Sequence, residues 1–270
     1  LTVVQLYLFG APYNPTISLD YYRIRPKVAR WLNTHDGECL FTEEQGRLPD
    51  AGPGNRGWLA GDMDVHWRQK EMVRPNRQML YDLRSANVFY ALVPERQWVL
   101  QRLAEASLRS DPGDGLWAAR PEAVLSALGA RIICTERHNR VSHLPIAVDF
   151  GAWVARINPG AMPLAYFATE MVSCHTEKEV LAWLCSPHFD PRRVAVEVPE
   201  GYGGGARAPG RVLQVENDWG RVTVRCRCDG KALLVVRETW DPHFRCWVDG
   251  KPARILRANY LFRAVELAAG

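Results

Sequence analysis

The chain has 270 residues, of which 47% are hydrophobic and 24% charged, and its formal net charge is +4. These values are typical of a globular protein, and the length suggests two domains. The small net charge and the scattered basic residues argue against a nucleic-acid partner, and no segment approaches the ~18 apolar residues that cross a bilayer.

The first nine residues, Leu1–Phe9, form an apolar run that is too short to span a membrane. The run has neither the charged start nor the cleavage site of a signal peptide. Taken alone, it is typical of a buried first strand.

Helices and strands are predicted to alternate over residues 20–200. A helix is expected at 20–33, where Val28, Trp31 and Leu32 share one stripe, and others at 94–107, 120–128 and 176–185. Thr176 and Glu179 have the spacing of a capping box. Strands are expected at 38–42, 85–92, 130–135, 146–150, 153–157, 165–172 and 193–198. This alternation predicts a mixed α/β N-terminal domain.

Residues 201–210 (GYGGGARAPG) are rich in glycine and are predicted to be a domain linker. Gly201, Gly203 and Ala206 superficially match a dinucleotide-binding fingerprint. That motif requires a helix N-terminus to bind the pyrophosphate, and here a predicted strand follows. No cofactor is therefore expected.

Every predicted element beyond this linker is a strand, at 211–216, 221–227, 232–240, 243–248, 253–256 and 260–267. Asp249-Gly250 is the usual sequence of a type I′ hairpin turn. The last strand is apolar on both faces, which is typical of a strand covered on both sides. We therefore expect residues 211–270 to form an all-β sandwich, immunoglobulin-like or jelly-roll-like.

Three cysteines of the predicted sandwich, Cys226, Cys228 and Cys246, are expected to be core thiols or to form one disulfide that involves Cys246. Cys226 and Cys228 should lie on one strand face, because side chains alternate along a strand. A zinc site needs about four ligands, and no second Cys/His pair has matching spacing.

No nucleophile-elbow sequence is present, and no catalytic residue is predicted. Asp62, Asp64 and His66 would share one face of an extended segment and could bind a divalent ion. Loops commonly contain such residues as solvated groups, so a metal site is the less favoured interpretation.

The chain contains ten tryptophans, and Trp58, Trp67, Trp240 and Trp247 lie in or beside predicted loops. Exposed indoles stack well on sugar rings, because their π-faces accept polarised C–H groups. These four residues are candidate carbohydrate-binding residues. The alternative is that they fill the core and the interface between the domains.

A resemblance to a known family covers nearly the whole chain and is strongest at 23–32, 161–198 and 233–270. The stretches that carry it include GAPYNP after the apolar start, NPGAMPLA at 158–165, and LLVVRETW…WVDGKPARILRANYLFRAVELAAG from Leu233. They are similar to the exoplasmic C-terminal region of YfhO-like bacterial polytopic membrane proteins. That family resembles glycosyltransferases that take sugars from polyprenyl-phosphate carriers. The chain departs from the family pattern at His243-Phe244, where Gly-Trp is usual, at Cys246, where a small residue is usual, and at Leu164, where an arginine is expected.

The resemblance implies that residues 1–19 contain the end of a membrane helix and the segment that follows it. The α/β domain at 20–200, the linker at 201–210 and the sandwich at 211–270 would then lie on the extracytoplasmic side of the cell membrane. Their partners would be the membrane-embedded part of the same polypeptide and an envelope glycopolymer.

In such glycosyltransferases, the catalytic acids lie in loops between membrane helices. The resemblance therefore implies that this part of the protein binds or positions the acceptor and does not catalyse transfer by itself. The alternative is a non-enzymatic carbohydrate-binding or structural module of the cell envelope.

Overall fold

The computed structural model describes residues 23–34, 39–43, 70–71, 73, 81, 83–87, 94–109, 117–218 and 220–270. These residues form a β-rich fold with four helices and sixteen strands in four sheets. None of the described helices is long and apolar enough to cross a bilayer. The predicted end of a membrane helix, within residues 1–19, lies outside the described residues.

The four helices of the described residues lie where the sequence predicts them: α3 (Lys27–Leu32), α5 (Glu95–Leu108), α6 (Pro121–Ala127) and α7 (Glu177–Cys185). Pro121 opens α6, and Gly129 follows it with a φ of +71°, a conformation that glycine adopts readily after a helix. The predicted capping box is confirmed, because the Thr176 side chain accepts a hydrogen bond from Glu179 N.

A five-stranded sheet has the order β2-β1-β3-β5-β4. Its strands are β1 (Cys39–Thr42), β2 (Arg84–Ser85), β3 (Ala130–Glu136), β4 (Ile146–Asp149) and β5 (Trp153–Ile157). β1 runs parallel to β2 and β3, whereas β5 is antiparallel to β3 and β4. Side chains of β3 alternate between two cores: Ile132 packs with α3, and Ile133 packs with α5 and α6.

A seven-stranded sheet has the order β6-β12-β16-β15-β8-β7-β9. Its strands are β6 (Ala165–Phe167), β7 (Glu170–Cys174), β8 (Arg193–Glu197), β9 (Gly205–Ala206), β12 (Ala232–Thr239), β15 (Leu256–Ala258) and β16 (Phe262–Leu267). Two hairpins complete the fold, one of β10 (Gly210–Asp218) and β11 (Arg221–Cys228), and one of β13 (Cys246–Val248) and β14 (Lys251–Ala253).

The seven-stranded sheet contains strands from both sides of residues 201–210. Part of this predicted linker, Gly205–Ala206, is itself β9 and pairs with β7. Residues 201–210 therefore do not separate one sheet from another, and the pairing of β8 with β15 joins the two parts of the chain. Glycine content indicates a loop locally, but it contains no information about which distant strands pair.

The prediction of one strand over 165–172 is wrong, because the structure contains two strands there, β6 and β7. β6 pairs with β12, whereas β7 pairs with β8. Between them, Ala168 N donates a hydrogen bond to Leu233 O and Thr169 N donates one to Arg192 O. At these two residues the chain therefore changes its pairing partner from β12 to β8.

The last strand is covered on both faces, as its sequence predicts. Phe262 and Ala264 pack in a core with α5, α6 and α7, whereas Val265 and Leu267 pack in another core with the β10–β11 hairpin. The strand begins at Phe262 and not at residue 260, because Asn259 and Tyr260 have positive φ angles of 43° and 74° in the turn after β15.

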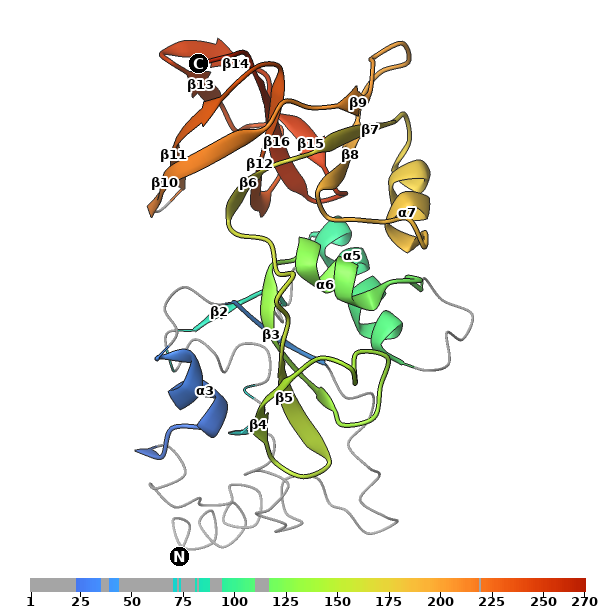
Figure 1. Cartoon of the computed structure of the whole chain (residues 1–270), viewed down its shortest axis with the longest axis vertical. Helices are drawn as coiled ribbons and strands as arrows, with labels where there is room; N and C mark the ends of the chain where they lie inside the picture. The colour runs from blue at the N-terminus through green and yellow to red at the C-terminus, as the bar shows by residue number, and fades with distance from the viewer. Residues whose placement is uncertain are drawn as a thin grey trace, which may run out of the picture.

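Figure 1 shows the seven-stranded sheet and hairpins at one end, α5 and α6 in the middle, and α3, β4 and β5 toward the other end.

Candidate carbohydrate-binding site

The structure brings together two of the four predicted carbohydrate-binding tryptophans. Trp240 and Trp247 line the same cavity, whose volume is about 250 Å³. The other predicted residues lie outside the described residues: Trp58 and Trp67, and the weaker metal candidates Asp62, Asp64 and His66. We refer to Trp240, Phe244 and Trp247 as the aromatic site.

Trp247 is exposed because of the alternation of side chains along β13. Its neighbours Cys246 and Val248 pack into the core beneath the β10–β11 hairpin, which directs Trp247 outward with 63% of its surface exposed. The turn that follows has φ angles of +49° at Asp249 and +77° at Gly250. This is the left-handed conformation that the Asp-Gly sequence predicts, and it confirms the hairpin.

Trp240 and Phe244 are each held by an arginine on one ring face. Arg257 Cζ lies 3.8 Å from the Trp240 ring centroid, and Arg263 Cζ lies 3.6 Å from the Phe244 ring centroid. At these distances, cation–π attraction fixes the orientation of both rings. Trp240 directly follows β12, and its backbone N donates a hydrogen bond of 2.7 Å to Leu261 O, which fixes its position beside the start of β16.

The loop between Trp240 and Phe244 is ordered by Asp241. Its Oδ1 accepts a hydrogen bond of 2.8 Å from His243 N and lies 2.7 Å from His243 Nδ1. These contacts with His243 hold the pKa of the Asp241 carboxyl below its usual range, so the carboxylate is negatively charged at neutral pH.

A larger cavity, of about 620 Å³, lies beside the same loop. Phe244 and Trp247 line both cavities, and Val236, Arg263 and Thr223 contribute only to the larger one. The larger cavity falls within the range of ~300–1,000 Å³ that is typical of small-molecule sites, and the smaller one lies just below it. A ligand in either cavity would therefore contact Phe244 and Trp247.

The aromatic site combines an apolar stacking surface with charged side chains. Trp247 offers an exposed indole face, while Asp241, Arg245 and Arg254 line the smaller cavity. The C–H groups of a sugar ring stack on an indole, and its hydroxyl groups form hydrogen bonds with such charged side chains. Sequence reasoning did not include Phe244, although an aromatic residue in a loop close to two candidate tryptophans is a signal for it.

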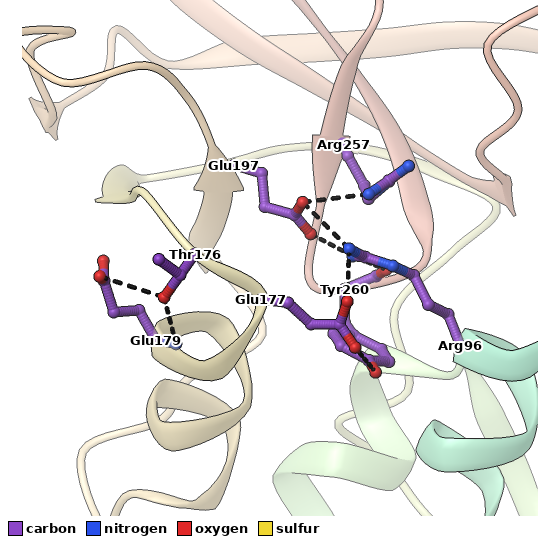
Figure 2. A network of polar contacts seen from close by, with 7 residues as sticks. All are labelled: Arg96, Thr176, Glu177, Glu179, Glu197, Arg257 and Tyr260. Carbon is purple, nitrogen blue, oxygen red and sulfur yellow. Dashed lines mark hydrogen bonds and ion pairs between the residues drawn. The ribbon is translucent and has the colours of Figure 1, made fainter.

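A second cluster of charged side chains lies between the helices and the seven-stranded sheet (Figure 2). Arg96, from α5, donates hydrogen bonds to Glu177 Oε2 at 2.8 Å and to both carboxylate oxygens of Glu197. Arg257 Nη1 donates a further hydrogen bond of 3.0 Å to Glu197 Oε2. Tyr260 Oη donates to Glu177 Oε1, and Arg96 Cζ lies 4.8 Å from the Tyr260 ring centroid.

These five residues, Arg96, Glu177, Glu197, Arg257 and Tyr260, form the junction network. Burial and the hydrogen bond to Glu177 raise the pKa of the Tyr260 hydroxyl, which therefore remains a donor. Arg96 Nη1 also donates to Tyr260 O at 3.2 Å, which holds the residue at its positive φ. Because its groups bind one another, we interpret the junction network as a stabilising cluster and not as a ligand site.

The cysteines of the predicted sandwich are free thiols, so the disulfide alternative is not realised in the structure. Cys226 and Cys228 lie on the less exposed side of β11, as predicted, because the neighbouring Arg225 and Arg227 are exposed. Burial raises the pKa of the Cys226 and Cys246 thiols, which favours their neutral form. Within the described ranges, no group of three or more His, Cys, Asp or Glu side chains could hold a metal ion.

Comparison of the chain with protein families, with curated proteins and with solved structures gives no match.

Proposed function

We propose that this protein is the extracytoplasmic, carbohydrate-binding part of a membrane-embedded glycosyltransferase-like protein. The observation that supports carbohydrate binding is the exposed indole of Trp247 beside a cavity that Trp240 also lines. The extracytoplasmic side, the membrane-embedded partner segment and the envelope glycopolymer rest on the sequence resemblance.

In this proposal, the protein binds or positions the acceptor polymer. A sugar ring stacks on Trp247, and its hydroxyl groups bond with Asp241, Arg245 or Arg254. The rigid placement of Trp240 and Phe244 reduces the entropy that the site loses on binding. Transfer of the sugar is assigned to the membrane-embedded part of the same polypeptide.

We further propose that the five-stranded sheet with α5 and α6 forms an α/β domain, and that residues 211–270 form a β-sandwich together with β6 to β9. Two observations support the α/β domain: β1 pairs in parallel with β2 and β3, and α5 and α6 lie between β2 and β3 in the sequence. The burial of both faces of β16 supports the β-sandwich.

The proposal is tested by titrating solubilised envelope polysaccharides into the purified protein and measuring the heat of binding. Trp247→Ala is expected to weaken binding about tenfold or more, because truncation of a tryptophan at the centre of a binding surface often costs more than ~2 kcal/mol.

Trp98→Ala is the matched control, because Trp98 is 55% exposed but lies on α5. This variant should bind as the unaltered protein does. Equal affinities of Trp247→Ala and the unaltered protein would contradict the proposal, as would the failure of the unaltered protein to bind any envelope polysaccharide.

A further inference from the structure

Strand β11 has an edge that no described strand covers. β11 pairs with β10 on one side, and among the strands that the structure describes it has no partner on the other side. We refer to this second side as the free edge of β11. At its end, Cys228 N donates a hydrogen bond of 3.0 Å to Gly270 O, and Cys228 O accepts one of 3.1 Å from Gly270 N.

The backbone groups of three more residues face the same edge. In an antiparallel strand, the N–H and C=O groups of successive residues face opposite edges. Asp229 N accordingly donates toward β10, to Pro209 O at 3.3 Å. The N–H and C=O groups of Val222, Val224 and Cys226 therefore face the free edge with those of Cys228. Within the described ranges, no other strand binds them there.

The free edge borders the larger cavity beside the aromatic site, of about 620 Å³. Val222 and Val224 line this cavity together with Trp247 of β13. Val236 of β12 and Val265 of β16 also line it, and both are apolar residues of the seven-stranded sheet. We refer to this cavity as the strand groove. An extended segment in it would bind the backbone of β11 and cover apolar side chains at the same time.

We propose that the strand groove binds an extended peptide segment of a partner protein, antiparallel to β11. Gly270 shows this orientation, since the exchange of both backbone hydrogen bonds with Cys228 is the pattern of an antiparallel pair. A peptide added to a free edge obtains its affinity from main-chain hydrogen bonds and its specificity from alternate side chains. The inference rests on the backbone of β11 and does not depend on carbohydrate binding at the aromatic site.

The side chains of β11 indicate the chemistry of this peptide. Val224 and Cys226 pack in the core beneath the hairpin, whereas Arg225 and Arg227 are exposed on the outer face. Residues directly opposite each other in neighbouring strands lie on the same face. Peptide residues opposite Val224 and Cys226 should therefore be apolar, and those opposite Arg225 and Arg227 should be acidic. β11 of a second copy fits less well, because it would place arginines opposite arginines.

The test measures the fluorescence anisotropy of a labelled synthetic peptide, in which valine and glutamate alternate, as the purified protein is added. Binding should be saturable. Methylation of the valine backbone nitrogens should weaken binding about tenfold or more, because these N–H groups face β11 and lose their hydrogen bonds. A peptide of the same composition, with all its valines before its glutamates, is the control and should bind no more tightly than the methylated peptide.

Two protein variants test the same groove. Val224→Pro removes an N–H donor from the free edge, where proline is tolerated because the pairing with β10 does not use that group. It should weaken binding of the alternating peptide about tenfold. Arg225→Glu should instead bind a peptide of alternating valine and lysine more tightly than the glutamate peptide. Arg192→Glu changes an exposed arginine before β8 and should keep the preference for glutamate.

The proposal is overturned if the alternating peptide does not bind, or if the methylated or control peptide binds as tightly. It is also overturned if Arg225→Glu and Arg192→Glu show the same charge preference. A dimer of the protein that Val224→Pro abolishes would show that a second copy occupies the groove, which contradicts the proposal as well.

Discussion

Glu43 is a buried carboxylate at the end of β1, with 9% of its surface exposed. Its Oε2 accepts hydrogen bonds from Thr135 Oγ1 and from Glu136 N. Burial nevertheless raises its pKa, because removing a charge from water costs more than these two bonds return. Glu43 therefore lowers the stability of the fold when it is ionised.

We predict that Glu43→Gln unfolds at a higher temperature than the unaltered protein at pH 7 to 8, because Gln Oε1 can accept the same hydrogen bonds without a charge. A raised folded-state pKa contributes stability that is present below the unfolded-state pKa of ~4.3 and is lost as the pH rises through the folded-state value. The advantage of the variant should therefore shrink as the pH falls and vanish below about pH 4.3.

Thermal unfolding between pH 4 and 8 measures this difference. The exposed Glu200→Gln, which does not contact Glu43, is the control and should show no comparable trend. A lower unfolding temperature for Glu43→Gln at pH 7 would show that the ionised carboxylate stabilises the fold.

At the scale of single elements, α7 shows how short-range chemistry positions a helix. Thr176 Oγ1 accepts a hydrogen bond of 3.2 Å from Glu179 N, and Glu179 Oε2 accepts one of 2.8 Å from His175 N. The helix then directs Val180 and Leu184 into the core. The residues that form these hydrogen bonds lie within four positions of one another, which explains why the helix can be predicted from the sequence.

We predict that Thr176→Ala lowers the free energy of unfolding by about 1 kcal/mol, the usual value of an N-cap side chain. Thr176→Ser keeps the hydroxyl group and should retain most of this stability. Chemical denaturation of the two variants measures the difference, and equal stabilities would show that the cap contributes nothing in this fold.

At the scale of the whole molecule, the junction network connects segments that are far apart in the sequence. Glu197 lies at the end of β8 and receives hydrogen bonds from Arg96 of α5 and Arg257 of β15 (Figure 2). Arg257 in turn lies over the Trp240 ring of the aromatic site. The network therefore connects the helical core to the orientation of one candidate carbohydrate-binding residue.

We predict that Glu197→Ala lowers the free energy of unfolding by about 2 kcal/mol, because it leaves two half-buried guanidinium groups without their shared acceptor. Glu170→Ala is the matched control. It breaks an exposed pair with Arg193 in the same sheet and should cost less than about 1 kcal/mol. Equal losses in the two variants, measured by denaturation, would contradict a special role for the junction network.

The sequence alone is enough to predict the local features of this protein. The four described helices, the cap at Thr176, the turn at Asp249-Gly250 and the two apolar faces of the last strand all follow from it. Each depends on residues a few positions apart, since helix periodicity, capping and turn geometry are short-range effects.

The tertiary structure, in contrast, sets which strands pair. It divides residues 165–172 between two neighbours in the sheet, makes β9 from part of the predicted linker, and combines strands from both sides of that linker. It also brings Trp240 beside Trp247, and β11 into one groove with Trp247 and Val265. Pairing and pocket formation depend on burying apolar surface between distant segments, and no local pattern specifies which distant segment becomes the neighbour.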